Sequence, residues 1–188
     1  MHTSWNLTAA LAVSFSIAGA AAAAPAATPA KIAPAPAVAK PAGVKALGDN
    51  AQIQALEKGF GAAAAAKDAN KVMTYYARQG LFVFDVAPPR QHVGWADYKK
   101  DWQDFFGFAA GPMSFTISDL AITAAGPVAW SHSIQTVHYA AKDGAKKAFV
   151  VRVTDVYRKQ AGKWLIVQEH VSVPVDVDTG KADLMSKP

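Results

Sequence analysis

The amino-acid sequence predicts an α+β domain in which three helices cover the concave face of a curved antiparallel sheet. Apolar residues recur every three or four positions in residues 50–80 and 94–106, and they alternate with polar residues from 113 to 176. Long strands twist and bulge, so a sheet of four such strands bends into a cup. The helices would close this cup, and its mouth can hold a small molecule.

Residues 1–24 are expected to be a secretory signal peptide. The stretch from Leu7 to Ala24 carries no charge, and its second half consists of small residues that suit cleavage. No Lys or Arg precedes the stretch, so an uncleaved membrane anchor is the alternative interpretation. Cleavage would give a periplasmic or secreted protein without stable membrane insertion.

Residues 25–48 are rich in Pro and Ala and are expected to form a semi-extended linker. The whole chain has a net charge of +5, but three lysines of this linker contribute to it. From Asp49 onward there are 16 basic and 14 acidic residues, a net charge of +2. A nearly neutral domain, here expected at 49–176, is not typical of nucleic-acid-binding proteins, so no nucleic-acid partner is predicted.

The first two predicted helices lie within residues 50–80. Their apolar positions have helical spacing, Asp68 is a suitable N-cap for the second helix, and Gly80 is a suitable stop. The third helix, at 94–106, carries aromatic side chains on one face and Lys and Asp on the other.

A short strand is predicted at 81–86, between Gly80 and two prolines. Four long strands follow the third helix, and Gly-containing turns separate them. Their ranges are 113–126, 127–141, 146–160 and 163–176. Short turns between consecutive strands predict an antiparallel meander, followed by a polar tail at 177–188.

The stretch RVTDVYRKQAGKWLIVQEHVSVP, residues 152–174, resembles SnoaL-like domains of the nuclear transport factor 2-like, or ketosteroid isomerase-like, superfamily. It is also similar to the association domain of calcium/calmodulin-dependent kinase II. The resemblance rests on Thr154, Tyr157, Arg158, the turn Gly162-Lys163-Trp164, His170, Ser172 and Pro174. It implies a cone-shaped fold over residues 50–176, commonly dimeric through the outer face of the sheet.

This resemblance does not fix a function. Members include steroid isomerases, polyketide cyclases, dehydratases and non-catalytic assembly modules. The sequence has no clear match to the isomerases' arrangement of a tyrosine with a protonated acid, so the resemblance does not imply isomerase chemistry.

Arg152 is the first candidate site residue, because its surroundings, AFVVRVTDV, are apolar and a buried guanidinium needs an anion. It would pair with Asp85, Glu169 or Asp155, or it would anchor an anionic ligand. Asp85 follows a short strand and is either a general base, if burial raises its pKa, or a partner or cap for the turn.

His170 is the second candidate for proton transfer. Regular alternation puts it on one strand face with Trp164, Ile166 and Ser172, and a concave face would place the imidazole inside the cup. A histidine that only packs within the sheet is the alternative. The hairpin register also decides whether Arg152 or a neighbouring valine faces the pocket.

Further contacts to a ligand are expected from Trp102, His132, Thr154 and Ser172. No metal site and no cofactor are predicted. The chain has no cysteine, and His132 and His138 would lie roughly 20 Å apart along one strand, too far for one ion. No phosphate loop, nucleophile triad or HExxH motif occurs.

Two hypotheses for the function follow. The first is a secreted protein whose pocket binds a small apolar molecule with a polar or anionic group. In its wider form, this hypothesis adds catalysis of a proton-transfer reaction of isomerase, cyclase or dehydratase type on the bound molecule. The second is a non-catalytic association module. Val167, Val171 and Val173 are expected on the outer sheet face, and such an apolar face predicts a homodimer under either hypothesis.

Overall fold

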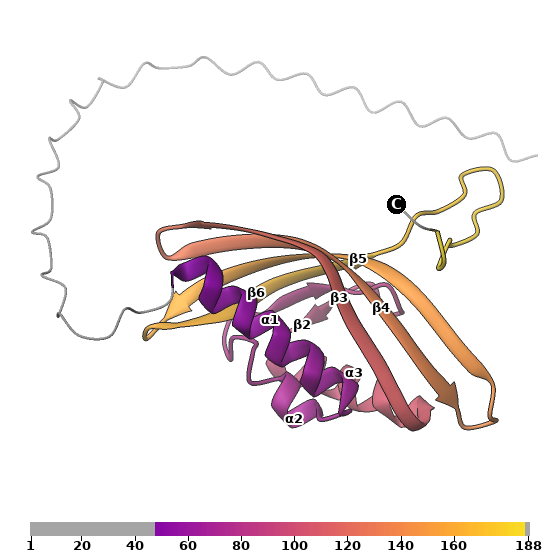
Figure 1. Ribbon diagram of the computed structural model, residues 1–188. Helices are drawn as coiled ribbons and strands as arrows, with labels where there is room; N and C mark the ends of the chain where they lie inside the picture. Colours follow the sequence, from indigo (N-terminus) through magenta and orange to yellow (C-terminus); the bar gives the residue numbers. More distant parts are fainter. Residues whose placement is uncertain (1–47, 187–188) are drawn as a thin grey trace, which may run out of the picture. The chain divides into compact units, whose positions relative to one another are not determined.

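The computed structural model describes residues 48–186, and Figure 1 shows the arrangement of their helices and strands. The expected signal peptide and all but the last residue of the expected linker lie outside the described residues. Within the described part no helix is long and apolar enough to cross a membrane. The helices are α1 Asp49–Ala65, α2 Ala69–Val72 and α3 Trp95–Phe108.

The strands are β1 Phe82–Phe84, β2 His92–Val93, β3 Ala109–Ala125, β4 Val128–Ala141, β5 Lys146–Gln160 and β6 Lys163–Ser172. They form one sheet in the order β2-β1-β6-β5-β4-β3. The four long strands pair antiparallel in chain order, as the sequence predicts. The short β1 instead pairs parallel with β6, and β2 extends this edge of the sheet.

The predicted α+β fold with helices on the concave face of a curved sheet is confirmed (Figure 1). The predicted N-cap is also confirmed, because the Asp68 carboxylate accepts a hydrogen bond from the Lys71 backbone N–H at 2.9 Å. The second helix is shorter than its apolar pattern predicts and ends at Val72. The backbone at Tyr75 and Ala77 hydrogen-bonds to Ile166 instead, which draws this segment alongside β6.

Aromatic side chains from both layers meet in the core between the helices and the sheet. Phe60 of α1 makes edge-to-face contacts with Tyr75, Tyr76, Trp102 and Phe115 at centroid distances of 5.7–6.4 Å. Such contacts stabilise the core beyond the burial of apolar area alone. They fix α1 and α3 against the sheet.

A bulge in β6 decides which side chains face this core. Ile166 pairs with Tyr157 and Gln168 pairs with Val156, so Val167 between them has no partner in β5. The extra residue reverses the alternation beyond it. Trp164 and Ile166 are buried before the bulge, whereas Glu169 is buried after it and His170 is exposed.

The last described residues return to the sheet. The Val150 N–H of β5 donates a hydrogen bond to the Leu184 carbonyl at 2.8 Å, and Val175 forms a bridge with Ala182. This segment therefore continues beside β5 past the end of β6.

Candidate functional site

Three carboxyl groups are buried between the helices and the sheet. Glu57 of α1 is 1% exposed, Asp155 of β5 is 1% exposed and Glu169 of β6 is 2% exposed. Asp155 and Glu169 are direct neighbours across the β5–β6 pair. In residues 48–186, neither Lys nor Arg forms an ion pair with any of the three. Because burial without a cation disfavours the charged form, these groups are expected to hold protons.

Tyrosine hydroxyls supply hydrogen bonds to Glu169. Tyr76 donates to Oε2 at 2.7 Å and Tyr98 donates to Oε1. Tyr98 comes from α3, while Tyr76 follows α2, so two helical segments hold one carboxyl group in place.

A second set of hydrogen bonds holds Glu57. Tyr157 of β5 donates to Glu57 Oε1 at 2.7 Å. Since the Tyr157 proton is used there, the Ser131 hydroxyl, also at 2.7 Å, donates to the Tyr157 oxygen. The Tyr157 hydroxyl oxygen also lies 3.5 Å from Asp155 Oδ2, which links the Glu57 group to the Glu169 group.

The surroundings shift the protonation of all three acids in one direction. Burial raises the pKa of Glu57 to about 7 against the hydrogen bond from Tyr157, which lowers it. Burial likewise raises the pKa of Glu169 to about 7, although Tyr98 and Tyr76 partly offset it. Burial and then the charges of Glu169 and Glu57 hold the pKa of Asp155 well above its usual value. Groups that titrate near neutral pH suit general acid–base chemistry.

Four buried polar atoms near this layer lack a hydrogen-bond partner within residues 48–186. They are Trp102 Nε1, Ser133 Oγ, Gln135 Nε2 and Asp155 Oδ1. Ser133 and Gln135 share a face of β4 with Ser131, and Trp102 comes from the covering helix α3. Buried polar groups are almost always bonded in native proteins, so this interior is suited to a bound polar atom.

A groove of about 770 Å³ between α1 and β3 borders on Glu57. Its small or apolar walls are Ala51, Ala55, Gly61, Ala62, Phe115, Ile117 and Leu120, and its polar or charged walls are Gln54, Lys58, Thr116, Ser118 and Asp119. This volume is within the range of small-molecule sites. Glu57 thus joins the buried acid network to a surface groove.

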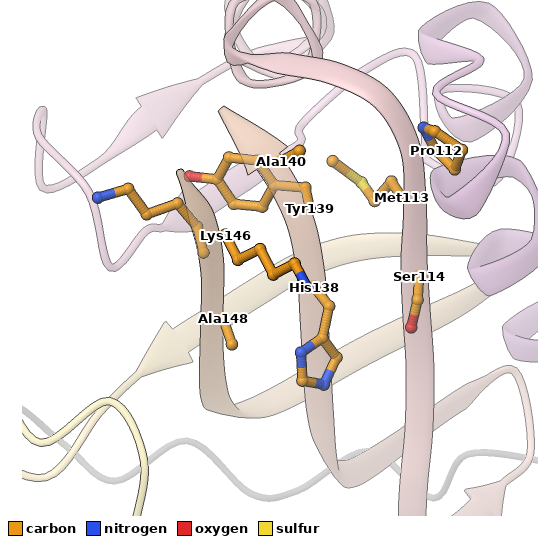
Figure 2. Close-up of a pocket in the computed structure, with 9 residues that line it drawn as sticks. Pro112, Met113, Ser114, His138, Tyr139, Ala140, Lys146 and Ala148 are labelled. Atoms are coloured by element: carbon orange, nitrogen blue, oxygen red, sulfur yellow. The ribbon is translucent and has the colours of Figure 1, made fainter. Parts of the chain in front are cut away.

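A second pocket, of about 450 Å³, lies where β3 and β5 begin and β4 ends (Figure 2). Met113, His138, Tyr139 and Lys146 are among its lining residues. It contains no carboxylate and none of the predicted site residues. We therefore place the candidate site at the α1–β3 groove and the acids behind it.

The predicted site residues of the strands come together, but on the opposite face of the sheet. His132 pairs with Thr154, Thr154 with His170, and Arg152 with Ser172. His132, Arg152, Thr154 and His170 are exposed, and Ser172 is half-buried. The prediction that His170 and Ser172 lie inside the cup is wrong, because the bulge at Val167 turns Glu169 inward instead.

The predicted burial of Arg152 is also wrong. Its side chain is exposed, whereas Asp155 and Glu169 lie on the inner face, so neither carboxylate can be its partner. The same bulge overturns the expected outward position of Val171, which pairs with the buried Val153.

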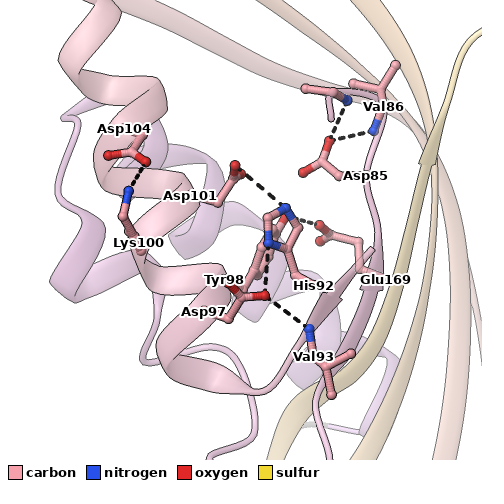
Figure 3. A network of polar contacts seen from close by, with 11 residues as sticks. Asp85, Val86, His92, Val93, Asp97, Tyr98, Lys100, Asp101, Asp104 and Glu169 are labelled. Carbon is pink, nitrogen blue, oxygen red and sulfur yellow. Dashed lines mark hydrogen bonds and ion pairs between the residues drawn. The ribbon is translucent and has the colours of Figure 1, made fainter. Parts of the chain in front are cut away.

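Asp85 and Trp102 lie closer to where the sequence predicts them than Arg152 and His170 do. Asp85 Oδ1 accepts hydrogen bonds from the Val86 and Ala87 backbone N–H groups at 2.5 and 3.3 Å, as the turn interpretation expects (Figure 3). Trp102 is 8% exposed and packs in the aromatic core behind the site.

The sequence did not predict Glu57 as a site residue, and Glu169 was predicted only as a partner for Arg152. Glu57 follows Ile53 by four residues and precedes Phe60 by three, so its place on the apolar face of the first helix was a readable signal. For Glu169 there was no such signal, because its inward position depends on an unpaired residue in β6.

Comparisons with known proteins agree with this architecture. A family model described as SnoaL-like domain matches residues 53–176. Comparison with curated proteins gives no match.

Solved structures with the same fold were also found. An NTF2-like protein of unknown function from Pseudomonas putida is 30% identical, with a TM-score of 0.66, covering 73% of this chain and 95% of the other. A Xanthomonas campestris protein provisionally named a calcium/calmodulin-dependent protein kinase II association domain is 23% identical, with a TM-score of 0.60 and coverage of 72% and 95%. A Novosphingobium aromaticivorans protein provisionally named a scytalone dehydratase is 15% identical, with a TM-score of 0.61 and coverage of 68% and 85%. The chain belongs to the SnoaL-like domain family of the NTF2-like superfamily.

Proposed function

We propose that this protein binds a small apolar molecule in the groove between α1 and β3 and transfers a proton to or from it through Glu57. One observation carries the proposal: Glu57 borders the groove while burial raises its pKa to about 7. A carboxyl group with this pKa is present in both protonation states at neutral pH.

The buried acids behind the groove determine which polar group a ligand can carry. The acids behind the groove have no cationic partner in the described part of the chain, and the predicted cationic anchor, Arg152, lies on the other face. The groove walls carry one cation, Lys58, and one further acid, Asp119, so they give no net attraction to an anion. An anionic group beside ionised Glu57 would meet like charge. We therefore expect an uncharged carbonyl or hydroxyl group, not a carboxylate.

The hydrogen bonds of Glu57 suit a reversible proton transfer. Tyr157 holds Oε1 in place, and Ser131 in turn holds the tyrosine oxygen. Protonated Glu57 would donate to a ligand oxygen, and ionised Glu57 would remove a proton from an adjacent carbon. Isomerisation of an unsaturated ketone and elimination of water both use these two steps.

Residues 1–24 support a proposal about location. Their uncharged apolar stretch followed by small residues is typical of an exported protein, so we propose that the domain acts in the periplasm or outside the cell.

Exchange of ligand protons with solvent tests the activity. Uncharged apolar ketones and matched carboxylates would first be screened for binding by saturation-transfer NMR, and deuterium uptake of bound ketones would then be followed in D2O. We expect ketones to bind, and Glu57→Gln to slow uptake by at least about 100-fold. Asp178→Asn, the same chemical change in an exposed turn, should keep the rate. An unchanged rate in the Glu57 variant would contradict the assignment.

The outer sheet face favours a second candidate function, a homodimeric association module. Trp130 is 47% exposed there, beside Val156 of the next strand. Phe84 and His170 add a ring contact with centroids 5.5 Å apart. Apolar groups on an uncovered sheet face support a partner surface, here a second copy of the chain.

Light scattering coupled to size-exclusion chromatography tests this candidate. We expect a dimer, and Trp130→Glu should convert it to a monomer by placing an unpaired charge in the interface. Lys142→Glu, in the exposed hairpin turn, is the matched control. A monomeric wild-type protein would exclude the association module.

A further inference from the structure

We propose that Asp85, His92 and Asp101 form a binding site for a divalent transition-metal ion (Figure 3). One oxygen from each carboxylate and one imidazole nitrogen all lie within 4.8 Å of one another. Asp85 directly follows β1, His92 is in β2 and Asp101 is in α3, so the fold itself assembles the group. This inference is independent of the function proposed for the groove.

The orientation of His92 is the main argument. Its side chain is 4% exposed, and Nδ1 lies 3.2 Å from Asp97 Oδ2. The Asp97 carboxylate also accepts a hydrogen bond from the Val93 backbone N–H. Because a carboxylate only accepts, Nδ1 carries a proton, and in the neutral imidazole Nε2 presents a lone pair.

That lone pair faces other acceptors. Nε2 has no hydrogen-bond partner within residues 48–186, and Asp101 Oδ1 lies 3.6 Å from it, beyond hydrogen-bond length. With His92 neutral, these are two acceptors directed at each other, and a positive centre between them, a proton or a metal ion, removes their repulsion. A metal ion is such a centre.

His92 also has the hydrogen-bond partner that is typical of metal-binding histidines. The second ring nitrogen of such a histidine commonly donates to a carboxylate, which fixes the tautomer, and Asp97 has this role here. One imidazole and two carboxylates suit zinc, manganese or iron, and three protein ligands leave a position for a further molecule. Two ligands at about 2.1 Å in tetrahedral geometry lie roughly 3.4 Å apart, so small side-chain rotations close the site.

The local charge favours a cation. No Lys or Arg of the described segment forms an ion pair with Asp85 or Asp101, and Lys100 on the same helix pairs with Asp104. Glu169 adds a further acid beyond Tyr98. The Asp101 side chain is 29% exposed, so an ion can enter from solvent.

Zinc titration of the chelator-treated full-length protein tests the site by calorimetry, and cobalt absorption in the visible range reports the ligand geometry. We expect saturable binding of one Zn²⁺ per chain. Asp101→Asn should weaken the affinity at least about 10-fold. Asp104→Asn, the same change three residues later on an exposed part of α3, should stay within about 2-fold.

A thermal readout separates binding from folding. Zinc should raise the melting temperature of the wild type and of Asp104→Asn, but not that of Asp101→Asn, because a ligand stabilises only a state that binds it. Should Asp101→Asn fail to fold, Asp85→Asn replaces it, since the amide oxygen can still accept the turn hydrogen bonds. Absence of saturable binding, or equal affinity in the variant and the wild type, would overturn the proposal.

Discussion

Glu57, Asp155 and Glu169 illustrate how position changes the chemistry of a side chain. An exposed carboxyl group is ionised at neutral pH, but these three are buried, and no Lys or Arg of residues 48–186 forms an ion pair with them. Hydrogen bonds from tyrosines recover part of the lost hydration, and the remaining cost raises the pKa values. At neutral pH, Glu57 and Glu169 are therefore each present in both protonated and ionised forms.

The raised pKa values predict how stability depends on pH. The folded protein binds protons more tightly than the unfolded chain, so its free energy of unfolding is greatest near pH 4.5 and falls as the pH rises through about 7. Asp155, whose pKa burial also raises, adds to this slope. Tyr76, Tyr98 and Tyr157 do not contribute in this range, because burial raises their pKa values above 10 and they stay protonated in both states.

Urea unfolding at pH 5 and pH 8 measures this effect. We expect the free energy of unfolding to be lower at pH 8, and Glu169→Gln to remove roughly 2–3 kcal/mol of that difference, most of the effect of a shift from 4.5 to about 7. Asp178→Asn should leave the difference intact. A protein that becomes more stable toward pH 8 would contradict the raised pKa values.

At the scale of the element, the bulge in β6 determines which chemistry faces the core. Periodicity in the sequence identifies alternating residues but not the face that each set occupies, and one unpaired residue exchanges the sets. On the neighbouring strands, which pair without a register shift, Arg152, Thr154 and His132 are on the outer face. The polar residues that face the core there are Asp155 of β5 and Ser131, Ser133 and Gln135 of β4. The strands were therefore predicted along the sequence, but the site residues were assigned to the wrong face of the sheet.

Alanine substitutions at two adjacent positions test the bulge. Glu169→Ala leaves the Tyr76 and Tyr98 hydroxyls without their acceptor, at a cost of about 1–3 kcal/mol for each unpaired group when measured at pH 5. His170→Ala, on the exposed face, should change the free energy of unfolding by about 0.5 kcal/mol or less. A strand that alternated regularly would give the opposite order.

The fold of the whole domain was readable because its signals are local and repeated. Long alternating strands, Gly-containing turns and helical spacing each recur several times, so an error in one segment does not change the class. The site was not readable to the same extent, since Glu57, Asp155 and Glu169 come from three elements and meet through tertiary packing alone. The two-residue β2 and the parallel pairing of β1 are likewise products of tertiary contacts.

In the whole molecule, the two proposed roles, ligand chemistry and dimer formation, belong to opposite sides of the sheet. The inner side holds the acid network and borders the groove, whereas the outer side carries Trp130 and the exposed histidines. Ligand chemistry and dimer formation can therefore be disrupted separately, Glu57→Gln acting on one and Trp130→Glu on the other.

An NMR titration of the glutamate side-chain carboxyl carbons tests the central claim most directly. We predict two coupled carboxyl groups that titrate near pH 7, one of which disappears in Glu57→Gln and the other in Glu169→Gln. Glutamate signals that all titrate below about pH 5, as exposed carboxyl groups do, would contradict the account.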